Sequence, residues 1–277
     1  MHLYITGTPI GNLEDMTFRA INTLKTVDAI LCEDTRKTRK LTAHFDIHTP
    51  LVAYHDHNKS VVEDKIIEEM RMGRTFALVS DAGMPLISDP GFELVRRMQE
   101  SGLTYSVVPG PSAYISAVVA SGIPSYEFTF FGFLPKNKKK KKDKLDEIMT
   151  HSLTSVLYES PHKIKETLKF IADIDGAREI SISREITKKF EQHVRHSASE
   201  IFAMIGESIP LKGEFVIVIS GNEATETAVF DTTEVEDVDE LIGEGFKPNA
   251  AIKKVAESRG IKRQDVYDMY HKNKKDG

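Results

Sequence analysis

The stretch Phe76–Gly91, FALVSDAGMPLISDPG, decides the fold. It opens with a short apolar run that predicts a buried strand, and a long turn of small and polar residues follows. Phe92, Val95 and Met98 then recur at helical spacing. A strand, a turn and a helix in this order predict one repeating unit of a parallel sheet.

The same alternation fills the first 125 residues. The other apolar runs that predict buried strands are Leu3–Thr6, Ala29–Cys32, Leu51–Tyr54 and Tyr105–Val108. The apolar residues at helical spacing between them are Phe18, Ile21, Leu24 and Val27, then Ile66, Ile67 and Met70. We therefore predict a mostly parallel sheet covered by helices on both faces.

The pattern changes after Ser121–Tyr126, where Gly and Pro interrupt the chain. The later predicted strands are Glu127–Leu134, Ser155–Tyr158, Glu179–Arg184, His193–Ser197 and Phe215–Ser220. The predicted helices are Lys144–Thr150, His162–Ile171 and Ser199–Ile205. We predict a second α/β domain with a mixed sheet, so that 1–122 and 123–222 form the two α/β domains.

An acidic, Thr-rich stretch, 223–236, is predicted to be a linker to a helical appendage, 237–277. Its predicted helices are Asp237–Gly243, Pro248–Ser258 and Lys262–His271, the last two separated by a short break at Gly260. This order is typical of a helix-turn-helix. It fits a small helical cap as well as a nucleic-acid-binding module.

Composition indicates an ordinary globular protein of the cytoplasm. Hydrophobic residues make up 40% and the one cysteine, Cys32, cannot form an internal disulfide. The N-terminus does not resemble a signal peptide, and no run approaches the roughly 18 apolar residues of a membrane span. The net charge of -5 disfavours nucleic acid, yet Lys136–Lys144 holds seven lysines in nine residues. We predict that Lys138–Lys142 is a mobile basic loop, either merely solvated or in contact with phosphates.

Three turns of small residues follow predicted strands: Gly7–Leu13, Ser80–Gly91 and Val108–Ala113. Each lies at the carboxyl end of its strand, where open α/β sheets bind ligands. None matches the dinucleotide fingerprint or the P-loop, which argues against a phosphate cradle. Together they predict a binding crevice for a small ligand.

Three other segments carry weaker signals. Asp34–Lys40 is either a solvated helix start or a phosphate contact. Tyr54–Asn58 contains two histidines but no further metal ligands, so we predict a polar cleft lining and no metal. Ser160–Lys163 has a serine beside a histidine but lacks the nucleophile elbow, which disfavours covalent catalysis.

These segments together resemble the tetrapyrrole-methylase superfamily, the class III S-adenosylmethionine-dependent methyltransferases. Within it, they resemble the branch that methylates 16S ribosomal RNA. The resemblance covers about residues 1–222 and is carried by YITGTPIGNLEDMTFRA, CEDTRKT, YHDHN, VSDAGMPLISDPG, VPGPSA, FFGFLP and YESPHK. The first turn reads GTPIGNL, where the tetrapyrrole branches typically have G-x-G-P-G-D.

The resemblance implies a cofactor cleft between two α/β domains, a homodimer and a helix-turn-helix-like appendage. It implies methyl transfer to the 2′-hydroxyl of a cytidine ribose in the decoding centre, with no metal. The implied cofactor residues are Pro9, Asp81, Ala82, Gly83, Pro85, Ile87, Ser88, Ser112, Ala113, Leu134, Tyr158, Glu159, Gly213 and Glu214.

The catalytic base is left open among His162, Lys163, Lys188, Glu185 and the two histidines His55 and His57. The residues predicted to bind RNA are Arg36, Lys37, Arg39, Lys40, His55, His57, Lys138, Lys139, Lys140, Lys141 and Lys142. Two alternatives remain, a methyltransferase acting on a tetrapyrrole and a non-catalytic RNA-binding protein on the same fold.

Overall fold

The computed structural model describes residues 2–55, 59–222, 232–259 and 261–273. The chain forms two compact units, Met1–Gly221 and Asn222–Gly277, referred to below as the N-terminal and C-terminal units.

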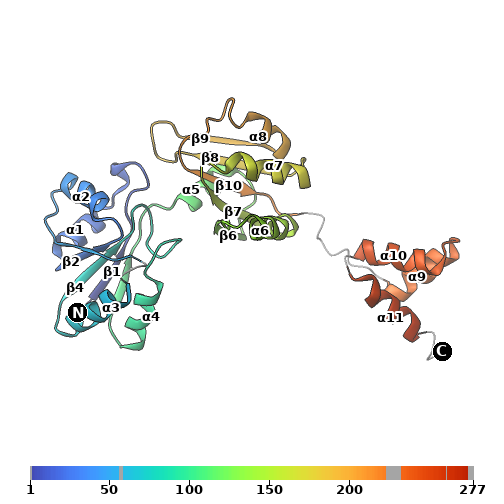
Figure 1. Ribbon diagram of the computed structural model, residues 1–277, viewed down its shortest axis with the longest axis horizontal. Helices are drawn as coiled ribbons and strands as arrows, with labels where there is room; N and C mark the ends of the chain where they lie inside the picture. Colours follow the sequence, from blue (N-terminus) through green and yellow to red (C-terminus); the bar gives the residue numbers. More distant parts are fainter. Residues whose placement is uncertain (1, 56–58, 223–231, 260, 274–277) are drawn as a thin grey trace. The chain divides into compact units, whose positions relative to one another are not determined.

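The first sheet of the N-terminal unit is entirely parallel, with strand order β3-β2-β4-β1-β5. Its strands are β1 (His2–Thr6), β2 (Ala29–Cys32), β3 (Leu51–Ala53), β4 (Thr75–Val79) and β5 (Tyr105–Val108). Figure 1 shows α1 (Phe18–Thr26) and α2 (Thr35–His44) on one face, with α3 (Lys59–Arg71) and α4 (Phe92–Glu100) on the other. Both predictions, parallel strands and helices on both faces, are confirmed. All five carboxyl ends therefore meet at one edge.

Burial on both faces explains the apolar strand sequences. In β2, Ala29 and Leu31 pack into one core while Ile30 and Cys32 pack into the other. Two residues of the predicted helical faces do not follow this pattern, because Phe18 is 88% and Phe92 is 65% exposed. Each is the first residue of its helix. Leu94 supplies the buried contact of α4 that the sequence pattern had assigned to Phe92.

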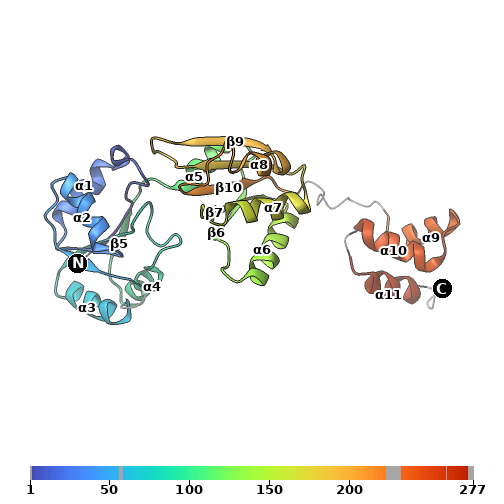
Figure 2. The same cartoon turned by 45° about the horizontal axis from the view of Figure 1, so that its top comes forward.

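The second sheet is mixed, as predicted, with order β6-β7-β10-β8-β9. Its strands are β6 (Phe128–Phe133), β7 (Thr154–Glu159), β8 (Glu179–Arg184), β9 (Gln192–Ser197) and β10 (Phe215–Ile219). Only the β6–β7 pairing is parallel. The helices α6 (Lys138–Thr150), α7 (Ile164–Ile174) and α8 (Ala198–Met204) share one core with this sheet, and Figure 2 shows them beside its strands.

Helix α5 (Ala113–Ser121) covers the opposite face of the second sheet. Its Ala117 and Val118 pack with Val156, Val216 and Val218. The helix thus begins in a turn of the first sheet and is buried against the second, on the N-terminal side of the predicted boundary at 122. The division of residues 1–222 into two domains stays a prediction.

The prediction of a basic loop at Lys138–Lys142 is wrong, because these residues form the first turns of α6. Asn137 caps the helix, its side-chain oxygen accepting a hydrogen bond from the Lys140 N–H (3.1 Å). Lysine is also a good helix former. The helix was predicted only from Lys144 onward because the run lacks the apolar residues that reveal a helical face.

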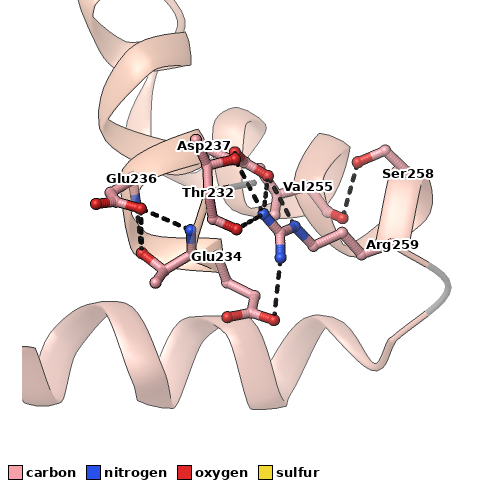
Figure 3. Close-up of polar contacts among 8 residues, drawn as sticks. Thr232, Glu234, Glu236, Asp237, Val255, Ser258 and Arg259 are labelled. Atoms are coloured by element: carbon pink, nitrogen blue, oxygen red, sulfur yellow. Dashed lines mark hydrogen bonds and ion pairs between the residues drawn. The ribbon is translucent and has the colours of Figure 1, made fainter. Parts of the chain in front are cut away.

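The C-terminal unit contains α9 (Glu234–Gly243), α10 (Pro248–Arg259) and α11 (Arg263–Asn273) around a small apolar core. Thr233 and Glu236 form a capping box at the start of α9, so helix occupies the last residues of the predicted linker. Arg259 is largely buried and joins α10 to α9 (Figure 3). Its guanidinium contacts Asp237 (2.6 Å) and Glu234 (3.3 Å).

No helix within the described residues is both long and apolar enough to cross a membrane.

Candidate functional site

A cavity of about 360 Å³ in the N-terminal unit lies where the carboxyl-end turns of the first sheet meet the second sheet. The predicted cofactor residues that line it are Asp81, Ala82, Gly83, Ile87, Ser88, Ser112, Ala113, Tyr158, Glu159 and Glu214. Those that do not line it are Pro9, Pro85, Leu134 and Gly213. The turns singled out in the sequence therefore do converge on one cavity.

Backbone contacts hold the turns after β1, β4 and β5 together. The Thr8 N–H donates to the Gly83 carbonyl (2.9 Å), and the Gly83 N–H donates to the Thr8 carbonyl (3.1 Å). A Cβ on Gly7 would lie 2.7 Å from the Gly110 Cα, so only glycine permits this approach. The first and third turns are thus fixed against each other, and the second is fixed to the first.

The segment between β4 and α4 carries unusual backbone conformations. Leu86 and Ser88 have φ angles of 71° and 67°, a left-handed region that costs energy for residues other than glycine. Ser88 also lies against the second sheet, because a Cβ on Gly132 would be 3.2 Å from its Oγ. Such strain is typical of functional segments, and Ile87, Ser88 and Asp89 of this segment all line the cavity.

Asp81 is bound by the loop and helix that follow β2. Its Oδ2 accepts a hydrogen bond from Lys37 Nζ at 2.7 Å, and its Oδ1 accepts from the Asp34 N–H at 3.3 Å. The hydrogen bond to Asp81 raises the pKa of Lys37. Lys37 therefore belongs to the basic segment Asp34–Lys40 and also holds a residue of the cavity wall in place.

Glu159 is the buried acid of the second sheet. It accepts hydrogen bonds from the Ser160 N–H (2.8 Å) and the Thr167 hydroxyl (2.6 Å). Lys141 Nζ lies 3.7 Å from Glu159 and 3.1 Å from Glu166. The side chain of Lys141 is only 9% exposed, and its contact with RNA stays a prediction.

A third lysine joins two acids at the end of β8 and the start of β10. Lys188 Nζ lies 2.9 Å from Glu185 and 3.0 Å from Glu214. Burial alone would lower the pKa of Lys188, but these two hydrogen bonds raise it. Burial alone would raise the pKa of Glu185, but Lys188 and the Glu214 N–H lower it. A lysine with a raised pKa and a carboxylate with a lowered pKa are both poor proton acceptors.

Two more candidates for the base do not line the cavity, although Ser160 and Pro161 just before them do. His162 is exposed and Lys163 is partly buried at the start of α7. The choice of catalytic base among the predicted residues stays a prediction.

Tyr158 contributes a protonated phenol to the cavity wall. Burial is the main cause that raises its pKa to about 12; the charges of Asp89 and Glu214 add to this, and a hydrogen bond with the Tyr114 backbone opposes it. Its ring lies 5.3 Å from that of Phe133, which also lines the cavity. The pair offers an aromatic surface and a hydrogen-bond donor.

Most of the cations predicted to bind RNA lie at the surface. Exposed residues among them are Arg36, Lys37, Arg39, Lys40, Lys138, Lys139, Lys140 and Lys142. Arg36 is paired with Asp34 at 2.9 Å but remains 86% exposed. His55 is partly buried, and His57 lies outside the described residues.

Sequence reasoning missed several lining residues. They are Ile10, Met84, Asp89, Phe133, Ser160, Pro161, Ile186, Phe215 and Val216. Most are immediate neighbours of predicted residues, so proximity to a motif was the signal available. Asp89 is one of them: it lines the cavity, and burial raises its pKa to about 6.

Comparison with known proteins gives a consistent picture. A family model described as Tetrapyrrole (Corrin/Porphyrin) Methylases matches residues 2–201. Two curated relatives are each 46% identical, over 97% of this chain and 94% of their own length. Both are named ribosomal RNA small subunit methyltransferase I, one from Halalkalibacterium halodurans and one from Bacillus subtilis.

Solved structures share the fold at low identity. The uroporphyrin-III-C-methyltransferase of Thermus thermophilus is 18% identical with a TM-score of 0.55, over 79% of this chain and 94% of that one. A diphthine synthase is 11% identical with a TM-score of 0.59, over 79% and 90%. These structures confirm the fold class predicted from the sequence.

Proposed function

This chain belongs to the family of tetrapyrrole (corrin/porphyrin) methylases, and we propose that it is an S-adenosylmethionine-dependent methyltransferase of ribosomal RNA. The observation that carries the proposal is the near-full-length similarity to relatives named ribosomal RNA small subunit methyltransferase I. The substrate position is the 2′-hydroxyl of a cytidine ribose in the decoding centre of 16S rRNA, within the small subunit.

The cavity has the size and the hydrogen-bond acceptors that the cofactor requires. Its volume of about 360 Å³ falls within the usual range for small-molecule sites. The carboxylates of Asp81, Glu159 and Glu214 line it, and their oxygens can accept hydrogen bonds from the ammonium and hydroxyl groups of the ligand. We assign the cofactor to the residues predicted from the sequence. Pro9, Pro85, Leu134 and Gly213 act by shaping the turns behind the cavity wall.

The chemistry needs positioning more than activation. S-adenosylmethionine supplies a methyl group already activated by a positive sulfur. The protein must hold the attacking oxygen in line with that methyl group and exclude water, and such alignment accounts for much of the rate gain in reactions of this type. The strained segment around Ser88 and the turns that follow β1 and β5 support this role. They fix the cavity wall against which both reactants would lie.

RNA binding is assigned to the exposed cations. In α2 these are Arg36, Lys37, Arg39 and Lys40, and in α6 they are Lys138, Lys139, Lys140 and Lys142. Each phosphate contact would add salt-dependent affinity, which offsets the net charge of -5. The chain works in the cytoplasm, where ribosomal subunits are assembled.

We also propose a homodimer. Helix α5 buries one side against the second sheet, yet its Ile115 and Val119 are 42% and 78% exposed, and Val107 of β5 is 48% exposed. These apolar side chains support a subunit contact at α5 and β5. Light scattering at micromolar concentration tests the oligomeric state.

The deciding experiment is tritiated methyl transfer from S-adenosylmethionine to 30S subunits, naked 16S rRNA and uroporphyrinogen in parallel. We expect label on a ribose 2′-oxygen of the RNA, and the more active RNA substrate identifies the form that is used. Label on uroporphyrinogen alone would place the chain in the tetrapyrrole branch. Cofactor binding without transfer to any substrate would favour a non-catalytic RNA-binding protein.

A further inference from the structure

Lysines neutralise three of the carboxylates around the cavity, each from a different element. Asp81 pairs with Lys37 at 2.7 Å, and Glu214 pairs with Lys188 at 3.0 Å. Glu159 has Lys141 at 3.7 Å and accepts two further hydrogen bonds. A carboxylate held by a cation and by N–H or O–H donors has little tendency to take up a proton.

Asp89 is the exception among the carboxylates of the cavity wall. It lines the cavity and is partly buried, and within the described parts of the chain it forms no ion pair with a lysine or arginine. The nearby Ser80 hydroxyl acts against the rise of its pKa. The preceding Ser88 is in the strained left-handed conformation that fixes the direction of this segment.

We propose that Asp89 is the proton acceptor of the methyl transfer, a role that rests on the function proposed above. The ribose O–H bond breaks and its proton passes to an Asp89 carboxylate oxygen. The hydroxyl oxygen bonds to the methyl carbon, and the carbon–sulfur bond breaks with its electron pair going to sulfur. The neutral thioether leaves, and the Asp89 carboxyl group then returns its proton to water.

The surroundings of Asp89 suit a base that works near neutral pH. Burial is the largest cause of its raised pKa of about 6, and the charges of Glu33 and Asp81 add to it while Ser80 opposes it. Tyr158 lines the same cavity from β7 and stays protonated. A base with such a pKa is ionised at cytoplasmic pH yet binds a proton more readily than an ordinary aspartate.

The test compares Asp89→Asn with wild type and with Asp46→Asn, a control at an aspartate whose side chain is 83% exposed. Transfer to the RNA substrate and cofactor affinity by calorimetry are measured for each. We expect Asp89→Asn to lower kcat about 100-fold or more, with cofactor Kd changed less than threefold. Asp46→Asn should match wild type. Unchanged kcat in Asp89→Asn beside an active wild type would overturn the proposal, as would lost cofactor affinity with kcat retained.

The pH profile separates a base from a structural role. The kcat/KM for cofactor reports the free enzyme, so in wild type it should rise with pH through about 6 and level off above it. In Asp89→Asn this rise should vanish, and Asp89→Glu should restore it in part. A rise that persists in Asp89→Asn would overturn the proposal. A wild type that methylates no RNA would instead overturn the proposed function, and this proposal with it.

Discussion

At the scale of single residues, the raised pKa of Asp89 has a consequence for stability. The group has an ordinary pKa of 3.8 when exposed and about 6 in the folded chain. Between these values the folded chain holds the proton that the unfolded chain has lost, so stability falls as pH rises to 6 and stays reduced above it. We expect Asp89→Asn to raise Tm relative to wild type by more at about pH 7.5 than at about pH 4.5. Equal effects at both pH values would show that the carboxylate is not destabilised by folding.

Gly213 supports the cavity although it does not line it. Its φ is 91°, and a Cβ there would lie 2.4 Å from Glu185 Cγ. Gly102 has a φ of 65° with no neighbour within 4 Å, so it serves as a matched control for backbone strain alone. We expect Gly102→Ala to cost about 1 kcal/mol. Gly213→Ala should cost more in urea unfolding and also weaken cofactor binding, because it displaces the Glu185–Lys188–Glu214 group. Equal costs would mean that Glu185 moves aside freely.

The sequence predicted the cavity residues that belong to local motifs. It did not predict the contacts between residues that are far apart in the chain. The turn residues Asp81, Gly83 and Ser112 were found because small residues after a strand mark a ligand-binding edge. The pairs that neutralise the acids join α2, α6 and the end of β8 to other elements. No local pattern indicates such contacts, so the distinct state of Asp89 could be recognised only in the folded chain.

At the scale of elements, α6 combines a buried and an exposed role within one basic run. Lys141→Met removes the cation from buried Glu159, and we expect it to lower the free energy of unfolding by about 3 kcal/mol. Lys140 is exposed, and Lys140→Met should leave stability unchanged. Denaturant unfolding of the two variants checks this contrast. Equal stabilities would show that the Lys141 pairing contributes nothing.

For RNA binding we expect the larger effect from Lys140→Met and the smaller effect from Lys141→Met, the reverse of their effects on stability. Lys140→Met is expected to reduce the slope of log affinity against log salt by about 0.7 to 0.9, the value for one phosphate contact. Lys141→Met should leave that slope unchanged wherever the variant is folded. Filter binding of 16S rRNA fragments at several salt concentrations measures both slopes. An unchanged slope in Lys140→Met would remove this lysine from the RNA surface.

The elements themselves were predictable to the extent that apolar residues mark them. The bounds of β2, β5 and β8 agree with the apolar runs Ala29–Cys32 and Tyr105–Val108 and with the mixed run Glu179–Arg184. Helix α6 was predicted several residues too short because its first turns are lysine, with a helix cap as the only signal. The pairing of Lys141 with Glu159 and Glu166 also stabilises the first turns of the helix, and no local sequence pattern indicates it.

At the scale of the whole molecule, the two compact units lead us to expect two unfolding transitions. Arg259 is the buried cation that joins α10 to α9 in the C-terminal unit, where it contacts Asp237 and Glu234. Arg259→Met leaves both acids without this cation. In calorimetry, the variant should lower the midpoint temperature of that unit's transition only. S-adenosylmethionine should raise the midpoint temperature of the N-terminal unit's transition only, because a ligand stabilises the unit that binds it.

The same variant decides what the C-terminal helices do. Exposed cations here are Lys254 of α10, Lys262 just before α11, and Arg263 and Lys272 of α11, which also exposes Asp265 and Asp268, whereas α9 is acidic. We expect Arg259→Met, at a temperature where only its C-terminal unit is unfolded, to bind 16S rRNA about tenfold more weakly, or about 1.4 kcal/mol. Cofactor affinity should be unchanged, since the cavity lies wholly in the N-terminal unit. Unchanged RNA affinity would make the helices a cap, and the RNA surface would then consist of α2 and α6 alone.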